Sequence, residues 1–157
     1  MKRNVYLFAV TIVCLSLSSG CGSLGGGGVP KEQINTDLAN SKIKAQRGND
    51  FKQQTDWEFK GDSYRCFAPI TDETKITDTT ADMMMNVSAV RLAQSEDTPT
   101  LFGKILLRYK KDGGNWKLDA IEPKDVRANE ITGDAFSKFI DLQMPLCSYF
   151  KFKGKDL

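Results

Sequence analysis

The chain has 157 residues, of which 40% are hydrophobic and 27% are charged, and its formal net charge is +2. This length and composition predict one folded domain and exclude a disordered chain. The chain contains no histidine. Histidine is the usual base beside serine and cysteine nucleophiles and the most common metal ligand, so we expect no enzyme, no metal site and no cofactor.

The first residues predict a secretory signal. Lys2 and Arg3 give a basic start, residues 5–17 are almost wholly apolar, and the small residues 18–20 follow. The apolar run is shorter than the roughly 20 residues that a membrane-spanning helix needs. We therefore expect residues 1–20 to be removed as a signal peptide rather than kept as a transmembrane helix.

The sequence Leu-Ser-Ser-Gly-Cys at 17–21 resembles the lipobox of bacterial lipoproteins, although its leucine stands one place further from the cysteine than in the commonest form. The resemblance implies cleavage before Cys21 and acyl chains on this residue, which together hold a protein durably on a membrane. Gly22 is not the aspartate associated with inner-membrane retention, so the resemblance implies the outer membrane if the source is Gram-negative. An ordinary signal that leaves Cys21 unmodified is the alternative.

Residues 21–29 predict a lipidated cysteine followed by a flexible tether, because a glycine-rich run buries no apolar surface and loses the most entropy when it is ordered. Residues 30–157 then form a single globular domain. Loss of Lys2 and Arg3 with the signal lowers the basic count from 22 to 20, which equals the acidic count of 20. A formally neutral mature chain does not favour a nucleic-acid partner, which needs clustered cationic surface.

The domain begins with a predicted helix. Pro30 suits its first turn, and the spacing of Ile34, Leu38 and Ile43 predicts one apolar stripe over residues 31–43. Beyond a break at Gly48, alternating apolar residues predict strands at 57–59, 64–70, 83–90, 101–109 and 116–120.

The clearest local structure is a hairpin from Tyr109 to Trp116. Its turn contains Gly113 and Gly114, which supply positive φ angles, and we expect the two aromatic rings to lie near each other across the strands.

The residues Gly-Lys-Ile-Leu-Leu-Arg-Tyr-Lys at 103–110 and Trp-Lys-Leu at 116–118 carry a second resemblance. With one helix before about four strands, residues 30–122 resemble the cystatin-like and nuclear-transport-factor-like superfamily. The resemblance implies an α+β fold with an N-terminal helix packed on a curved antiparallel sheet of about four strands. The Gln-x-Val-x-Gly loop of cystatin protease inhibitors is absent, so the resemblance does not imply protease inhibition.

The fold prediction ends with a C-terminal helix and a short strand. Asp134 can cap a helix over residues 135–143, Pro145 stops it, and residues 146–152 are aromatic enough for a last strand. Lysines alternate along this tail at Lys151, Lys153 and Lys155. They predict a solvated strand edge, and contact with anionic lipid or cell-wall polymer is the alternative.

Two cysteines remain once Cys14 is assigned to the signal and Cys21 to lipid. An exported chain with this spare pair favours a disulfide between Cys66 and Cys147, and two buried thiols are the alternative. The absence of a Cys-x-x-Cys motif argues against redox catalysis.

Two further patterns predict structure rather than a site. The acidic residues between Asp72 and Asp82 lack the order of a calcium loop, so we expect a polar connection between strands. Three consecutive methionines, 83–85, alternate in direction along a strand and cannot converge on one copper ion, so we expect them to fill the core.

Two functional hypotheses remain. The first is a membrane-anchored, non-catalytic interaction or structural module of the cell envelope, with a protein partner of unknown identity. The second is a small-ligand-binding lipoprotein that uses a pocket between the helix and the sheet. An apolar hollow of about 300 Å³ or more at that place favours the second.

Overall fold

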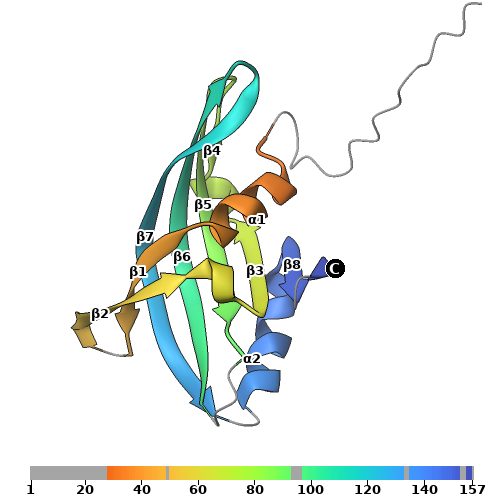
Figure 1. The fold of residues 1–157 in the computed structure, drawn as a ribbon. Coiled ribbons are helices and arrows are strands. Elements are labelled where there is room, and N and C mark those ends of the chain that lie inside the picture. The colour runs from red at the N-terminus through yellow and green to blue at the C-terminus, as the bar shows by residue number, and fades with distance from the viewer. Residues whose placement is uncertain (1–27, 49, 93–96, 133–134, 153–154, 157) are drawn as a thin grey trace, which may run out of the picture.

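The computed structural model describes residues 28–48, 50–92, 97–132, 135–152 and 155–156. Within them, nine strands form one large sheet and two α-helices pack on it (Figure 1). The elements in chain order are α1 (Lys31–Ala39), β1 (Lys42–Arg47), β2 (Asp50–Glu58), β3 (Tyr64–Pro69), β4 (Lys75–Ile76), β5 (Thr80–Val90), β6 (Asp97–Asp112), β7 (Asn115–Thr132), α2 (Ala135–Gln143), β8 (Tyr149–Phe152) and β9 (Lys155–Asp156).

The sheet is mixed. Its strand order is β2-β1-β7-β6-β5-β3-β8-β9, and β4 pairs with β5 beside this path. Neighbouring strands are antiparallel except β1 and β7, which run parallel and pair through Gln46–Arg127 and Arg47–Ala128. The prediction of a helix on an antiparallel sheet of about four strands is therefore wrong, because the described chain is mostly sheet and has more strands.

One source of this error lies at the end of α1. The helix ends at Ala39 rather than at residue 43, and Asn40 and Ser41 bond through their side chains to the backbone carbonyls of Thr36 and Asp37. Five residues separate Leu38 from Ile43, which is about 140° off one helical face at 3.6 residues per turn. Ile43 therefore joins the core from β1.

The other source of error is the length of β7. We expected its strand to end near residue 120, but it continues through Pro123 to Thr132. Beside Pro123 the register against β6 shifts, so β7 carries one extra residue there. Such bulges accommodate proline, which lacks the backbone N–H that a regular ladder requires. The continuation of β7 provides the strand edge with which β1 pairs.

The Tyr109–Trp116 hairpin is confirmed, with Asp112 opposite Asn115, but its expected aromatic pair is not formed. A second register shift places Tyr109 opposite Leu118, and Trp116 lies opposite Lys111. The Lys111 ammonium lies 5.0 Å from the centre of the Trp116 ring.

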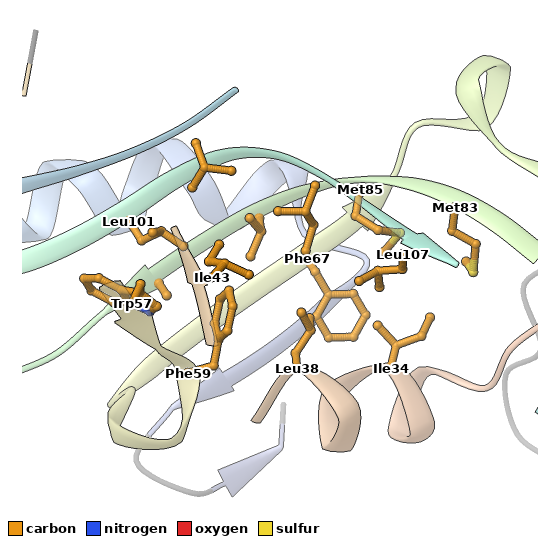
Figure 2. Close-up of a cluster of buried hydrophobic side chains, with 14 of the residues drawn as sticks. Ile34, Leu38, Ile43, Trp57, Phe59, Phe67, Met83, Met85, Leu101 and Leu107 are labelled. Atoms are coloured by element: carbon orange, nitrogen blue, oxygen red, sulfur yellow. The ribbon is translucent and has the colours of Figure 1, made fainter. Parts of the chain in front are cut away.

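The main core lies between α1 and the sheet. Figure 2 shows Ile34 and Leu38 of α1 pointing toward Phe67, Met83, Met85 and Leu107, with Trp57, Phe59, Ile43 and Leu101 further along the same face. Met83 and Met85 are 1% and 0% exposed, as expected for core residues. Full burial of such side chains contributes about 1.5 to 3 kcal/mol each.

The opposite face of the sheet is covered only in part. The helix α2, at the residues that the sequence predicted, packs Phe139 and Ile140 against a smaller cluster that contains Tyr64, Val90 and Phe150. Beyond α2 this face carries the ion pairs Arg108–Glu122 and Lys110–Asp119 between β6 and β7, and Lys104 of β6 pairs with Glu73 in the 3₁₀ turn at Thr71–Glu73. Exposed pairs of this kind contribute roughly 0 to 1 kcal/mol each, so their main effect is to keep the face solvated.

Candidate functional site

The predicted site residues fall into two groups. Cys21, the proposed lipid acceptor, lies outside the described residues. The structure brings Cys66 of β3 and Cys147, four residues beyond the end of α2, together as a disulfide, with 5.5 Å between their Cα atoms. Beside them the hydroxyl of Ser88 donates to Oε1 of Gln143 at 2.6 Å, which also holds the end of α2 against the sheet.

A group of charged side chains that the sequence analysis did not predict lies at the end of the main core. Asp62 follows the 3₁₀ turn at Phe59–Gly61, Arg65 comes from β3, and Arg91 directly follows β5. The indole N–H of Trp57 on β2 donates to Oδ1 of Asp62 at 3.1 Å. We call Asp62, Arg65, Arg91 and Trp57 the arginine cluster.

Burial controls the charges in the arginine cluster. It raises the pKa of Asp62 to about 7, against the opposing effect of Arg65, Arg91 and the indole N–H. Burial also lowers the pKa of Arg65, which is 5% exposed. Within the described residues, Nε and Nη1 of Arg65 and Nε of Arg91 have no hydrogen-bond partner. Near neutral pH the cluster therefore carries more positive than negative charge.

Arg91 is held firmly. Its guanidinium carbon lies 4.7 Å from the centre of the Trp57 ring, and its Nη2 donates to the backbone oxygen of Glu58 at 2.6 Å. Its own backbone N–H donates to the carbonyl of Pro99 at 3.0 Å. Gly61 lies alongside, and a Cβ at this position would come within 3.0 Å of Nε of Arg91.

A hollow of about 360 Å³ opens beside Arg91 and Trp57. It lies between the β1–β2 hairpin and the adjoining ends of β6 and β7, and its polar lining includes Arg47, Thr55, Arg91, Asn129 and Glu130. We call it the Arg47–Arg91 hollow. By contrast, buried side chains fill the space between α1 and the sheet (Figure 2), which is where the ligand-binding hypothesis required an apolar pocket.

A different surface lies at the end of α2. Leu142, Met144 and Leu146 are 70%, 40% and 61% exposed, compared with 37% for Ile76 and Leu92. Leu146 also borders a hollow of about 220 Å³ whose walls include Phe102, Ser88 and Gln143. We call Leu142, Met144 and Leu146 the α2-end patch.

The other candidates from the sequence lie in the sheet and its connections. Glu73 pairs with Lys104, and Asp82 lies 4.0 Å from Arg108, so these acids face separate partners. Among the described residues no group of three or more cysteine, aspartate or glutamate side chains could hold a metal ion. Nor does any described helix combine the length and apolar character needed to cross a membrane.

Comparison with protein-family models, with curated proteins and with solved structures finds no match to this chain.

The arginine cluster was missed because both faces of β3 are buried. The alternation over residues 64–70 placed Tyr64 and Cys66 on one face of this strand, which leaves Arg65 and Phe67 on the other. In the structure Tyr64 and Cys66 face α2, and Arg65 and Phe67 lie in the layer beneath α1. Phe67 could have indicated this arrangement. It is an apolar residue on the same face as Arg65, and apolar residues on both faces are typical of a central strand that is buried on both sides.

Proposed function

We propose that this chain is a membrane-anchored lipoprotein of the cell envelope that acts as a non-catalytic interaction module. The basic and apolar start, the lipobox-like residues 17–21 and the glycine-rich tether support the anchor. Lipid on Cys21 places the domain at a membrane, the outer one in a Gram-negative cell, and about nine residues of tether let it move some 30 Å from the surface. The domain itself then needs no membrane-inserted segment.

The α2-end patch is the surface that we assign to a protein partner. Leu142 and Leu146 expose most of their side chains, whereas the large apolar side chains of the main core are buried. Burial of apolar surface against a partner contributes roughly 25 cal/mol per Å². The adjoining hollow accepts one further apolar side chain, and the disulfide holds the patch on the sheet. This exposure is the observation that carries the proposal, and the partner is an envelope protein that presents apolar side chains.

Photocrosslinking in intact cells tests this assignment. A photoreactive residue at Met144 should yield an adduct with another envelope protein. The double variant Leu142→Glu, Leu146→Glu should reduce its yield at least about tenfold, because carboxylates in an apolar contact cost more than 1.4 kcal/mol. Ile76→Glu is the matched control, since Ile76 is 37% exposed on β4, away from the patch, and should leave the yield unchanged.

Three outcomes would contradict the assignment. They are the absence of any adduct, an adduct equally abundant in the double variant, and an adduct that contains two copies of this chain. The last would assign the patch to self-association instead of an envelope partner.

A further inference from the structure

We propose that the Arg47–Arg91 hollow binds a small ligand through an oxyanion, the carboxylate or phosphate group of that ligand. This site is separate from the α2-end patch and does not depend on the proposed function. The hollow measures about 360 Å³, near the lower end of the range for small-molecule sites. Its size favours one small ligand, or the head of a larger one.

Arg91 is preorganised to bind an anion. Stacking on Trp57 and the bond to the Glu58 carbonyl fix its guanidinium before any ligand arrives. A fixed guanidinium has already lost the side-chain freedom that binding would otherwise cost. Its planar fork of N–H groups matches carboxylate and phosphate oxygens, which a lysine ammonium cannot reproduce.

The charged side chains around the hollow also favour an anion. Arg47 and Arg91 line it, as do Asp56 and Glu130. Lys42 and Lys44 lie 2.9 and 2.5 Å from Asp56, so its charge is already compensated. Lys42 also lies 3.5 Å from Glu58, so four cationic side chains stand against the three carboxylates of Asp56, Glu58 and Glu130. The hollow and its immediate partners therefore carry a small net positive charge, which favours an anion.

Arg65 does not line the hollow, but it adds positive charge beside Asp62, which also interacts with Arg91. Arg65 is 5% exposed, and two of its nitrogens have no hydrogen-bond partner among the described residues. Asp62 is the acid between Arg65 and Arg91, and burial weakens its ability to neutralise them. An anion in the hollow would supply negative charge that the protein's own side chains provide only in part.

The remaining lining residues add hydrogen-bonding capacity. The Thr55 hydroxyl and the Asn129 amide both border the hollow, and each offers a donor as well as an acceptor. These neutral groups suit the hydroxyl or amide groups of a small organic acid. Inorganic phosphate and citrate are therefore suitable probes of the same chemistry.

Trp57 provides the readout. The chain has two tryptophans, so Trp116→Phe leaves Trp57, directly beneath Arg91, as the sole indole. Its fluorescence is titrated with phosphate and with citrate at constant ionic strength. We expect saturation in the millimolar range or below, as for a small anion with two arginine contacts.

Three variants in this background decide the matter. Arg47→Gln and Arg91→Gln should each weaken binding at least about tenfold, as loss of a charged hydrogen bond does. Arg108→Gln removes the same charge from the ion-paired opposite face and should change affinity less than about twofold, because screening weakens distant charges. Arg47 is exposed, so its variant keeps the test decisive even where Arg91→Gln unfolds.

Vesicles identify the source of the oxyanion. A Trp57 response to phosphatidylglycerol vesicles that is absent with phosphatidylcholine and lost in Arg47→Gln would assign the site to a lipid headgroup. A response confined to phosphate or citrate would assign it to a free ligand. The proposal is overturned by the absence of saturation with every probe, or by equal weakening in Arg47→Gln and Arg108→Gln.

Discussion

Replacement of Asp62 by asparagine should remove most of the dependence of stability on pH between about pH 4 and pH 8. The Asp62 carboxyl is largely buried beside Trp57, and burial raises its pKa to about 7 although Arg65 and Arg91 attract its charged form. In the unfolded chain the same carboxyl has its ordinary pKa near 4. Asparagine has nearly the same shape and stays neutral at every pH.

The sign follows from the proton balance. Between about pH 4 and pH 7 the folded chain holds a proton that the unfolded chain has released, so the free energy of unfolding falls as the pH rises. The pKa difference of about 3 units amounts to a loss of about 4 kcal/mol over this window, at 1.36 kcal/mol per unit. Above pH 7 both states have released the proton, so the free energy of unfolding stops falling. The Asp62→Asn chain has no proton to release at this position and does not show this fall.

The carboxyl groups of Asp56 and Glu122 act in the opposite direction but in a different pH range. The lysine partners of Asp56 lower its pKa, and a hydrogen bond from Lys124 does the same for Glu122. A lowered folded pKa gives stability that is present above the unfolded value near 4 and is lost on acidification. Their contribution therefore appears below about pH 4, outside the window in which Asp62 titrates.

Urea unfolding at a series of pH values between 4.5 and 8.5, roughly spanning the window set by the two pKa values, measures the effect. The wild-type free energy of unfolding should fall with pH, whereas that of Asp62→Asn should remain nearly level and exceed the wild-type value at pH 8. Asp141→Asn removes an exposed carboxylate on α2 and should keep the wild-type slope. Parallel profiles for wild type and Asp62→Asn would refute the reasoning.

Three further predictions concern the anchor, the disulfide and a glycine. Cys21→Ser should abolish incorporation of a palmitate analogue and release the protein from membranes, and label retained by this variant would contradict the anchor. Nonreducing peptide mapping of the exported protein should show Cys66 linked to Cys147, and loss of this link, 81 residues apart in sequence, should lower stability by about 4 kcal/mol; two alkylatable thiols in the folded protein would contradict the link. Gly103→Ala should cost about 3 kcal/mol or more in thermal or urea unfolding, because its φ is +142° and a Cβ would overlap a carbonyl oxygen of β7. Gly113→Ala, at φ +56° in open space, should cost about 1 to 2 kcal/mol, and equal costs for the two would contradict the overlap.

The pattern of apolar residues in the sequence predicted those strands and helices in which buried residues recur at the period of the element. Residues 83–90 and 101–109 alternate strongly, and they lie within β5 and β6 with Met83 and Met85 buried. The helix over 135–143 was predicted from its apolar spacing and the proline that follows, and α2 spans these residues. In each case one face is apolar along the whole element, so the period alone determines the structure.

The parallel contact between β1 and β7 left no such pattern. It rests on two residue pairs, and the two strands are far apart in the chain. The β1–β2 hairpin that forms it buries Ile43 and Trp57, whereas its other face carries charged residues that resemble a loop in sequence. The pairing of β1 with β7 requires β7 to continue beyond Pro123. It continues through a bulge beside Pro123, which is a feature of the tertiary structure rather than of the local sequence.

The arginine cluster shows why the candidate site could not be predicted with the fold. Asp62 and Arg91 are separated in sequence by the three strands β3, β4 and β5, and each alone resembles an ordinary surface charge beside a turn. They meet because β3 and β5 are neighbours in the sheet, with Tyr64 opposite Val90. Sequence-based rules fail most often at functional sites, where residues depart from the usual preferences for burial and pairing. Arg65 is buried, and two of its nitrogens have no hydrogen-bond partner among the described residues, while Arg91 of the same cluster lines the hollow. Burial without a partner costs free energy that a bound anion would offset.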